Sequence, residues 1–202
     1  NNTATLENNG TLTTSTLDNT ATVENNGTLT TATLDNTGTL DNNGTLTTST
    51  LENIATLENS GTITIFTFNN DGNTTGDGTY NITGEFSSSG TFFSEAGTVN
   101  MNGTSSQIMD MEASTFYNLT INNAESVTLN STQTVITNNL TINSEKIFIL
   151  EADKNLTVTG TIDNYGGTAG FILKSNDLGT ASLIHNSIDV PATFQRYITG
   201  VA

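Results

Sequence analysis

Apolar residues recur with a period of 17 along the first third of the chain. Residues 2–18, 19–35, 36–52 and 53–69 are four copies of one pattern, and a degenerate fifth copy follows them. Three apolar columns, spaced 6, 5 and 6 residues apart, run through the copies: Leu6, Val23, Leu40 and Leu57; Leu12, Leu29, Leu46 and Ile63; and Leu17, Leu34, Leu51 and Phe68. A glycine column accompanies them at Gly10, Gly27, Gly44 and Gly61. A fixed period of this kind indicates a repeat architecture.

Polar and apolar positions alternate around each apolar residue. In the segment Thr3–Glu7, Ala4 and Leu6 fall on one side and the polar residues on the other. This alternation predicts short, half-buried strands, and exposed Thr is favourable in strands. The Asn-Asn-Gly at 8–10 and the Asp-Asn at 18–19 predict turns, because these residue types tolerate positive φ. The period of 3.6 residues that a helix requires is absent.

A single copy is too small to bury its own leucines, so the copies must stack on one another. Three strands per copy stack most simply as a parallel β-helix, with successive coils about 4.8 Å apart. We therefore predict an all-β chain that forms a right-handed parallel β-solenoid. Leucine columns should lie inside it and threonines outside.

The pattern loosens after residue 69 without disappearing. Asn-Leu-Thr-Ile or Asn-Leu-Thr-Val recurs at Asn118, Asn139 and Asn155. We predict a regular 17-residue solenoid over 1–69, irregular loop-bearing coils over 70–113 and larger coils over 114–202. These regions should be continuous and form about ten coils in a rod about 50 Å long. Because the chain begins within a repeat, we expect either a segment of a longer protein or a subunit that stacks end to end.

Composition supports an ordered and acidic surface. The chain holds 43 Thr and 29 Asn, and its 20 acidic residues against 4 basic ones give a net charge of -16. Only 12% of residues are charged, and β-branched Thr dominates, which argues against disorder. The charge disfavours nucleic-acid binding. Cysteine is absent, which excludes a disulfide framework, and no apolar run is long enough to predict membrane insertion.

Several phrases in the second half carry a family resemblance. They are Phe116–Ala124, Val127–Asn130, Asn138–Asn143, Asn155–Gly160, Phe171–Ser175, Gly179–Ile184 and Phe194–Gly200. With these phrases the chain resembles repeat-rich β-helical surface and secreted proteins of Bacteroidota, many of them adhesin-like substrates of type IX secretion. The resemblance implies an extracellular or cell-surface location.

Residues suited to catalysis are sparse. The chain has one histidine, His185, and one arginine, Arg196. Two acid pairs, Asp110 with Glu112 and Glu151 with Asp153, are each spaced to share a strand face, but acid–base catalysis needs such groups in a cleft with separated pKa values. We predict no enzymatic activity and no cofactor. A polysaccharide-acting β-helix enzyme is the remote alternative.

Acidic residues also form columns. Glu7, Glu24, Asp41 and Glu58 occupy one column, and Asp18, Asp35 and Glu52 occupy another. Stacked like charges destabilise a sheet, so either salt screens them or divalent cations such as Ca²⁺ bridge them. Two interpretations of the acidic columns stay open. The first column binds Ca²⁺ weakly, or the carboxylates form a negatively charged surface that keeps the rod soluble.

Threonine and asparagine columns complete the repeat. A surface grid is predicted from Thr11, Thr13, Thr28, Thr30, Thr45, Thr47, Thr62 and Thr64, which resembles the threonine ranks of ice-binding solenoids. We expect this grid to end after four coils and to have counterparts on the other faces. Asparagines at Asn8, Asn25 and Asn42, with Asn9, Asn26, Asn43 and Asn59, should stack their amides at corners.

Together these features predict a non-catalytic structural or adhesive solenoid of a bacterial extracellular or surface protein. It would meet glycans or surfaces through many weak contacts. The alternatives are a self-assembling fibre subunit and an ice-binding protein.

Overall fold

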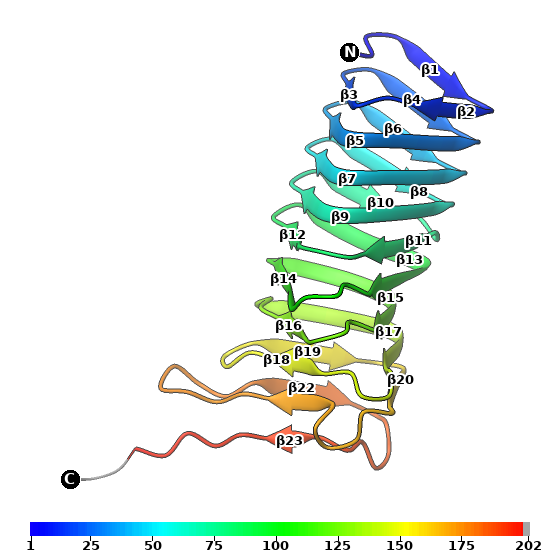
Figure 1. Cartoon of the computed structure of the whole chain (residues 1–202). Helices are drawn as coiled ribbons and strands as arrows, with labels where there is room; N and C mark the ends of the chain where they lie inside the picture. The colour runs from blue at the N-terminus through cyan, green and yellow to red at the C-terminus, as the bar shows by residue number, and fades with distance from the viewer. Residues whose placement is uncertain (200–202) are drawn as a thin grey trace.

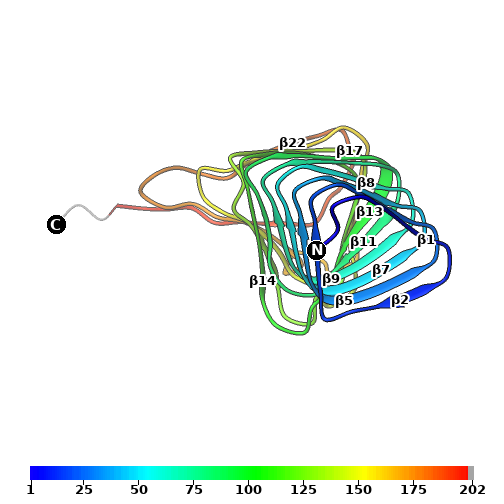
Figure 2. The ribbon, with the colours of Figure 1, turned by 90° about the horizontal axis from the view of Figure 1, so that it is seen from above.

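The computed structural model describes residues 1–199, which form an all-β structure with no helix. Twenty-three strands join in one sheet that winds into a parallel β-solenoid of about 11 turns, with coils of roughly 18 residues. Seen from the N-terminal end, the chain runs clockwise as it recedes, so the solenoid is right-handed (Figures 1 and 2). The predicted fold is confirmed. In this range no helix is long and apolar enough to span a membrane.

Each coil has three faces, and the short strands belong to one face each. The first face holds β1 (Thr5–Asn8), β4 (Thr22–Asn25), β6 (Thr39–Asn42), β8 (Thr56–Asn59), β10 (Asn73–Thr75), β19 (Asn155–Val158) and β22 (Ser182–His185). The second face holds β2 (Thr11–Thr13), β11 (Thr79–Ile82) and β20 (Thr161–Asn164). The third face holds β3 (Thr16–Asn19), β12 (Phe86–Ser88), β14 (Gln107–Met111), β16 (Val127–Leu129), β18 (Phe148–Leu150), β21 (Phe171–Leu173) and β23 (Thr193–Phe194).

Longer strands bend around a corner and serve two faces. The second and third faces share β5 (Thr28–Asn36), β7 (Thr45–Asn53) and β9 (Thr62–Asn70), and the first and second faces share β13 (Thr91–Met101), β15 (Ala113–Ile121) and β17 (Gln133–Ile142). These strands pair one coil with the next, as the stacked arrows of Figure 1 show, with register shifts only at the corner that β13, β15 and β17 turn.

The predicted apolar columns line the interior and continue past the regular repeats. The strand register pairs Leu57 with Thr74 and Thr74 with Phe92, Ile63 with Tyr80 and Tyr80 with Val99, and Phe68 with Phe86 and Phe86 with Met109. The column residues are buried, except that Leu6 and Leu12 are only partly so. Their coil pairs with a neighbour on one side only.

In the regular coils, inward polar side chains occupy the corners. One asparagine column consists of Asn8, Asn25, Asn42 and Asn59, and a second consists of Asn2, Asn19, Asn36, Asn53 and Asn70. Each Nδ2 except those of Asn59 and Asn70, which end the columns, donates to the Oδ1 one coil later at 2.6–2.8 Å. At the remaining corner the hydroxyls of Thr31 and Thr48 each donate to a backbone carbonyl two residues later at 2.8 Å. The predicted amide stacking is confirmed, and the second column is an addition to it.

The interior changes character near the fifth coil. The asparagine column that contains Asn70 ends there, because Asn70 donates to the hydroxyl of Ser88 at 3.0 Å. Aromatic rings follow: Phe68 stacks on Phe86 with centroids 5.1 Å apart, and Phe86 meets Phe92 edge to face at 5.1 Å. Aromatic packing thus replaces amide hydrogen bonds as the interior filling.

Tyr80 lies where these two kinds of interior meet. Its ring is fully buried, and its hydroxyl has no hydrogen-bond partner of good geometry. Burial raises the pKa of Tyr80 far above its ordinary value, and the nearby Asn59 amide lowers it in part. The phenol is therefore neutral at every physiological pH.

Residues 70–113, expected to bear loops, form β10 to β14 and continue the same stack. The coils lengthen at their corners: Phe92 pairs with Ser114, which is 22 residues further on, and the register shifts between Ser94 and Thr98. The faces on either side keep their pairing. Residues 200–202, which end the third predicted region and include the glycine of the Phe194–Gly200 phrase, lie outside the described residues.

Candidate functional site

The first face carries the acidic ladder proposed for calcium. Glu7, Glu24, Asp41 and Glu58 pair directly from coil to coil, so the predicted column exists. All four side chains are exposed or half-buried. Within residues 1–199, no three acidic or histidine side chains converge as a metal cage would require. The ladder is a line of single carboxylates, one per coil.

The calcium hypothesis for this ladder stays a prediction. If Ca²⁺ bridges successive carboxylates, CaCl₂ should raise the melting temperature well beyond NaCl of equal ionic strength, because bound oxygen ligands would join adjacent coils. The double substitution Glu24→Gln with Asp41→Asn should remove that excess, whereas Asp35→Asn on the third face should keep it. Equal shifts with both salts would leave only screening.

The acidic ladder of the third face changes its chemistry along the rod. After Asp18, Asp35 and Glu52, the same register position holds Asn69, Ser87 and Asp110. The Asn69 amide donates to Glu52 at 2.6 Å, and Ser87 donates to Asn69 at 2.7 Å. On this face, side chains that donate hydrogen bonds stand between the carboxylates. Fewer like charges therefore lie directly opposite one another.

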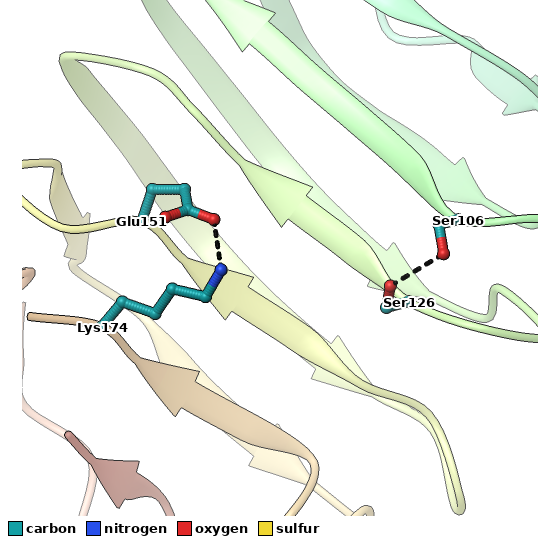
Figure 3. A network of polar contacts seen from close by, with 4 residues as sticks. All are labelled: Ser106, Ser126, Glu151 and Lys174. Carbon is teal, nitrogen blue, oxygen red and sulfur yellow. Dashed lines mark hydrogen bonds and ion pairs between the residues drawn. The ribbon is translucent and has the colours of Figure 1, made fainter.

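Further along the rod, the same ladder of the third face contains an ion pair. Lys174 Nζ lies 2.6 Å from Glu151 of the preceding coil, with both side chains about one-third exposed (Figure 3). At a neighbouring corner Ser126 donates to Ser106 at 3.3 Å (Figure 3). Such half-exposed contacts contribute on the order of 1 kcal/mol or less, so they adjust the stack without holding it together.

The second face carries the predicted threonine grid. Thr11, Thr28, Thr45 and Thr62 stand in one outer column, and Thr13, Thr30, Thr47 and Thr64 in the other. All eight are exposed or half-exposed, and none of their hydroxyls takes part in a hydrogen bond within residues 1–199. These hydroxyls are available to solvent.

The Thr-x-Thr grid ends after four coils, as expected, because no later coil holds threonine at both outer positions of the second face. The two outer columns themselves continue in a mixed form through Thr79 and Asn81, Thr98 and Asn100, Asn118 and Thr120, Asn139 and Thr141, and Thr161 and Asp163. Asparagine replaces threonine at some positions, which hid the continuation. The expected counterparts on the other faces exist in part. Thr22 and Thr33 belong to outer threonine columns of the first and third faces, but the second outer column of each is acidic, with Glu7 on the first face and Asp18 on the third.

Two of the acids considered for catalysis, Asp110 and Glu112, line one surface hollow together with Asp71 and Lys154, and the other candidates are not among its lining residues. His185 is half-buried and continues an inward position that Val158 occupies one coil earlier. Glu151 is engaged by Lys174, and Asp110 accepts a hydrogen bond from Asn130 at 3.1 Å. Arg196 is exposed beyond the last strand. None of these contacts joins an acid and a base in a cleft.

A hollow that spans the first face and the corner before it is a feature that sequence patterns did not reveal. It measures about 600 Å³ and is lined by residues of β13, β15 and β17, including Phe93, Thr115 and Val135, with Glu112 and Gln133 at its edge. Phe93 is 42% exposed. An exposed ring beside polar groups is a surface on which a sugar can stack. The only sequence signal was the Phe-Phe pair at 92–93, of which one ring points inward.

Comparison with protein-family models, curated proteins and solved structures finds no match to this chain. The resemblance of its second half to Bacteroidota surface proteins stays a prediction.

Proposed function

We propose that this chain is a non-catalytic structural and adhesive rod, a segment of a bacterial protein that acts outside the cell or at its surface. The observation that carries the proposal is the continuous register of all three faces from the first coil to β19, β20 and β21. A rod of this kind holds whatever it bears at a fixed distance.

Stiffness follows from how the coils are joined. Each coil is bound to the next by backbone hydrogen bonds on three faces, by apolar columns and, in the regular part, by two amide columns. Bending the rod would open several of these contacts at once on one side. A repetitive outer surface suits adhesion through many weak contacts, which gain strength when they act together.

The hollow beside Phe93 is the place where we expect a weak glycan contact. Beads that display many copies of the chain should be retained by surface polysaccharides, whereas a single copy should bind weakly. Phe93→Ala should lower the retention, and Phe66→Ala, which removes an exposed ring at another corner, should leave it unchanged. The measurement is bead retention on a glycan array.

Two outcomes would contradict this proposal. Equal loss for both phenylalanine variants would mean that Phe93 has no special role in adhesion. Cleavage of any polysaccharide on the array would replace the non-catalytic rod with an enzyme.

A self-assembling fibre subunit is the structural alternative. It predicts filaments of indefinite length in electron micrographs of the purified chain. A rod segment predicts single particles about 50 Å long, from about 4.8 Å per coil.

A further inference from the structure

The second face differs from the other two in its charge. Its outer positions form two columns over nine coils and hold thirteen Thr, four Asn and a single acid, Asp163. The first and third faces carry the acidic ladders. The fold thus separates a long uncharged hydroxyl and amide surface from the charge that keeps the rod soluble.

The second face is also a lattice. Neighbouring positions along a strand that face outward are about 6.6 Å apart, and the same position recurs about every 4.8 Å along the rod. Residues that enlarge the later coils enter at corners, as between Ser94 and Thr98, so the pairing across this face stays one to one. Buried residues such as Leu46, Tyr80 and Leu140 lie directly beneath and hold the outer side chains in place.

The outer threonine side chains present both polar and apolar groups to water. Each threonine offers a hydroxyl that donates and accepts and a methyl group beside it. In the first four coils these hydroxyls have no protein partner, as described above. Further along, outer side chains bond to one another from coil to coil: the Asn100 amide donates to Asn81 at 2.9 Å, and the Asn118 amide donates to Thr98 at 3.3 Å. Such a surface can hold first-shell water in a regular array.

We propose that the second face binds ice. Hydroxyls would anchor water at lattice positions, methyl groups would order the water between them, and the array would join a growing crystal. This partner fits better than a crystalline polysaccharide, because no aromatic ring stands among the outer positions of this face. It also fits better than a protein partner, which would need large apolar or arginine anchors that the face lacks.

The test measures thermal hysteresis, and enrichment of the protein in slowly grown ice, on the purified chain. The wild-type chain should slow crystal growth and enter the ice. Thr45→Tyr with Thr47→Tyr should abolish both effects, because two bulky rings interrupt the lattice at its third strand while keeping a residue type that favours strands. The matched control is Thr39→Tyr with Thr56→Tyr on the first face, which should keep full activity.

Circular dichroism and melting temperature establish that each variant is folded. If the second-face variant fails to fold, Thr47→Lys provides the same interruption with a single flexible side chain. A folded wild-type chain that neither slows growth nor enters ice would overturn the proposal. Equal loss in the first-face control, or retention of the chain by crystalline cellulose or chitin but not by ice, would overturn it as well. None of these outcomes depends on glycan adhesion at Phe93.

Discussion

Replacing Asn42 with alanine is expected to lower the free energy of unfolding by about 3 kcal/mol, because it interrupts a buried amide column. The Asn42 amide donates to Asn59 at 2.7 Å and accepts from Asn25 at 2.6 Å, and all three residues are buried. Alanine would leave a donor on one side and an acceptor on the other without partners. Urea unfolding followed by circular dichroism measures the change.

The adjacent residue supplies the control. Asn43 is exposed and donates only to the exposed Asn26, at 3.1 Å. Asn43→Ala should therefore change the free energy of unfolding by less than about 0.5 kcal/mol. Asn42→Leu should not restore stability, because it fills space without supplying the amide. Similar losses for Asn42→Ala and Asn43→Ala would show that the corner tolerates any side chain and that the column contributes little.

Gly44→Ala is expected to destabilise the chain by about 3 kcal/mol or more. A methyl group built on Gly44 would overlap the carbonyl oxygen of Gly27 in the preceding coil. The corner would have to move away and weaken two backbone hydrogen bonds, from Gly44 N to Asn25 O and from Thr45 N to Gly27 O, both 2.8 Å. The midpoint of urea unfolding, with hydrogen exchange at residues 40–50, measures the loss.

The same substitution in the first coil is the matched control. Gly10 occupies the equivalent position, but a methyl group there would meet no atom within 4 Å. Gly10→Ala should be close to neutral. If Gly10→Ala and Gly44→Ala cost the same, the glycine column would serve the turn itself and not the approach of neighbouring coils.

The glycine column shows where sequence reasoning stopped short. The repeat predicted turns at these positions and explained glycine by positive φ. Gly76 and Gly167 are the glycines with positive φ among residues 1–199, and neither belongs to the repeated column. Crowding between coils explains the column instead. The close approach of each glycine to the backbone of the preceding coil arises only when the coils stack. No local sequence pattern could therefore show it.

The apolar, acidic and outer threonine columns could be predicted because the 17-residue repeat places similar residues at the same register position in successive coils. The second amide column was missed for a related reason. Asn19 and Asn36 follow an acidic residue in a turn-like dipeptide, so they resembled turn residues with no inward role. The hollow beside Phe93 depends on how far successive corners project, which residue types alone do not determine.

The faces keep their pairing while the corners take up extra residues. Insertions and deletions that arise during replication can therefore accumulate at corners without moving any outward column off its line. A lineage could vary the length of a coil, or acquire a new projection from one corner, while a flat surface elsewhere on the same coil is inherited unchanged. In such a chain, selection on a projection and selection on a flat surface can proceed independently.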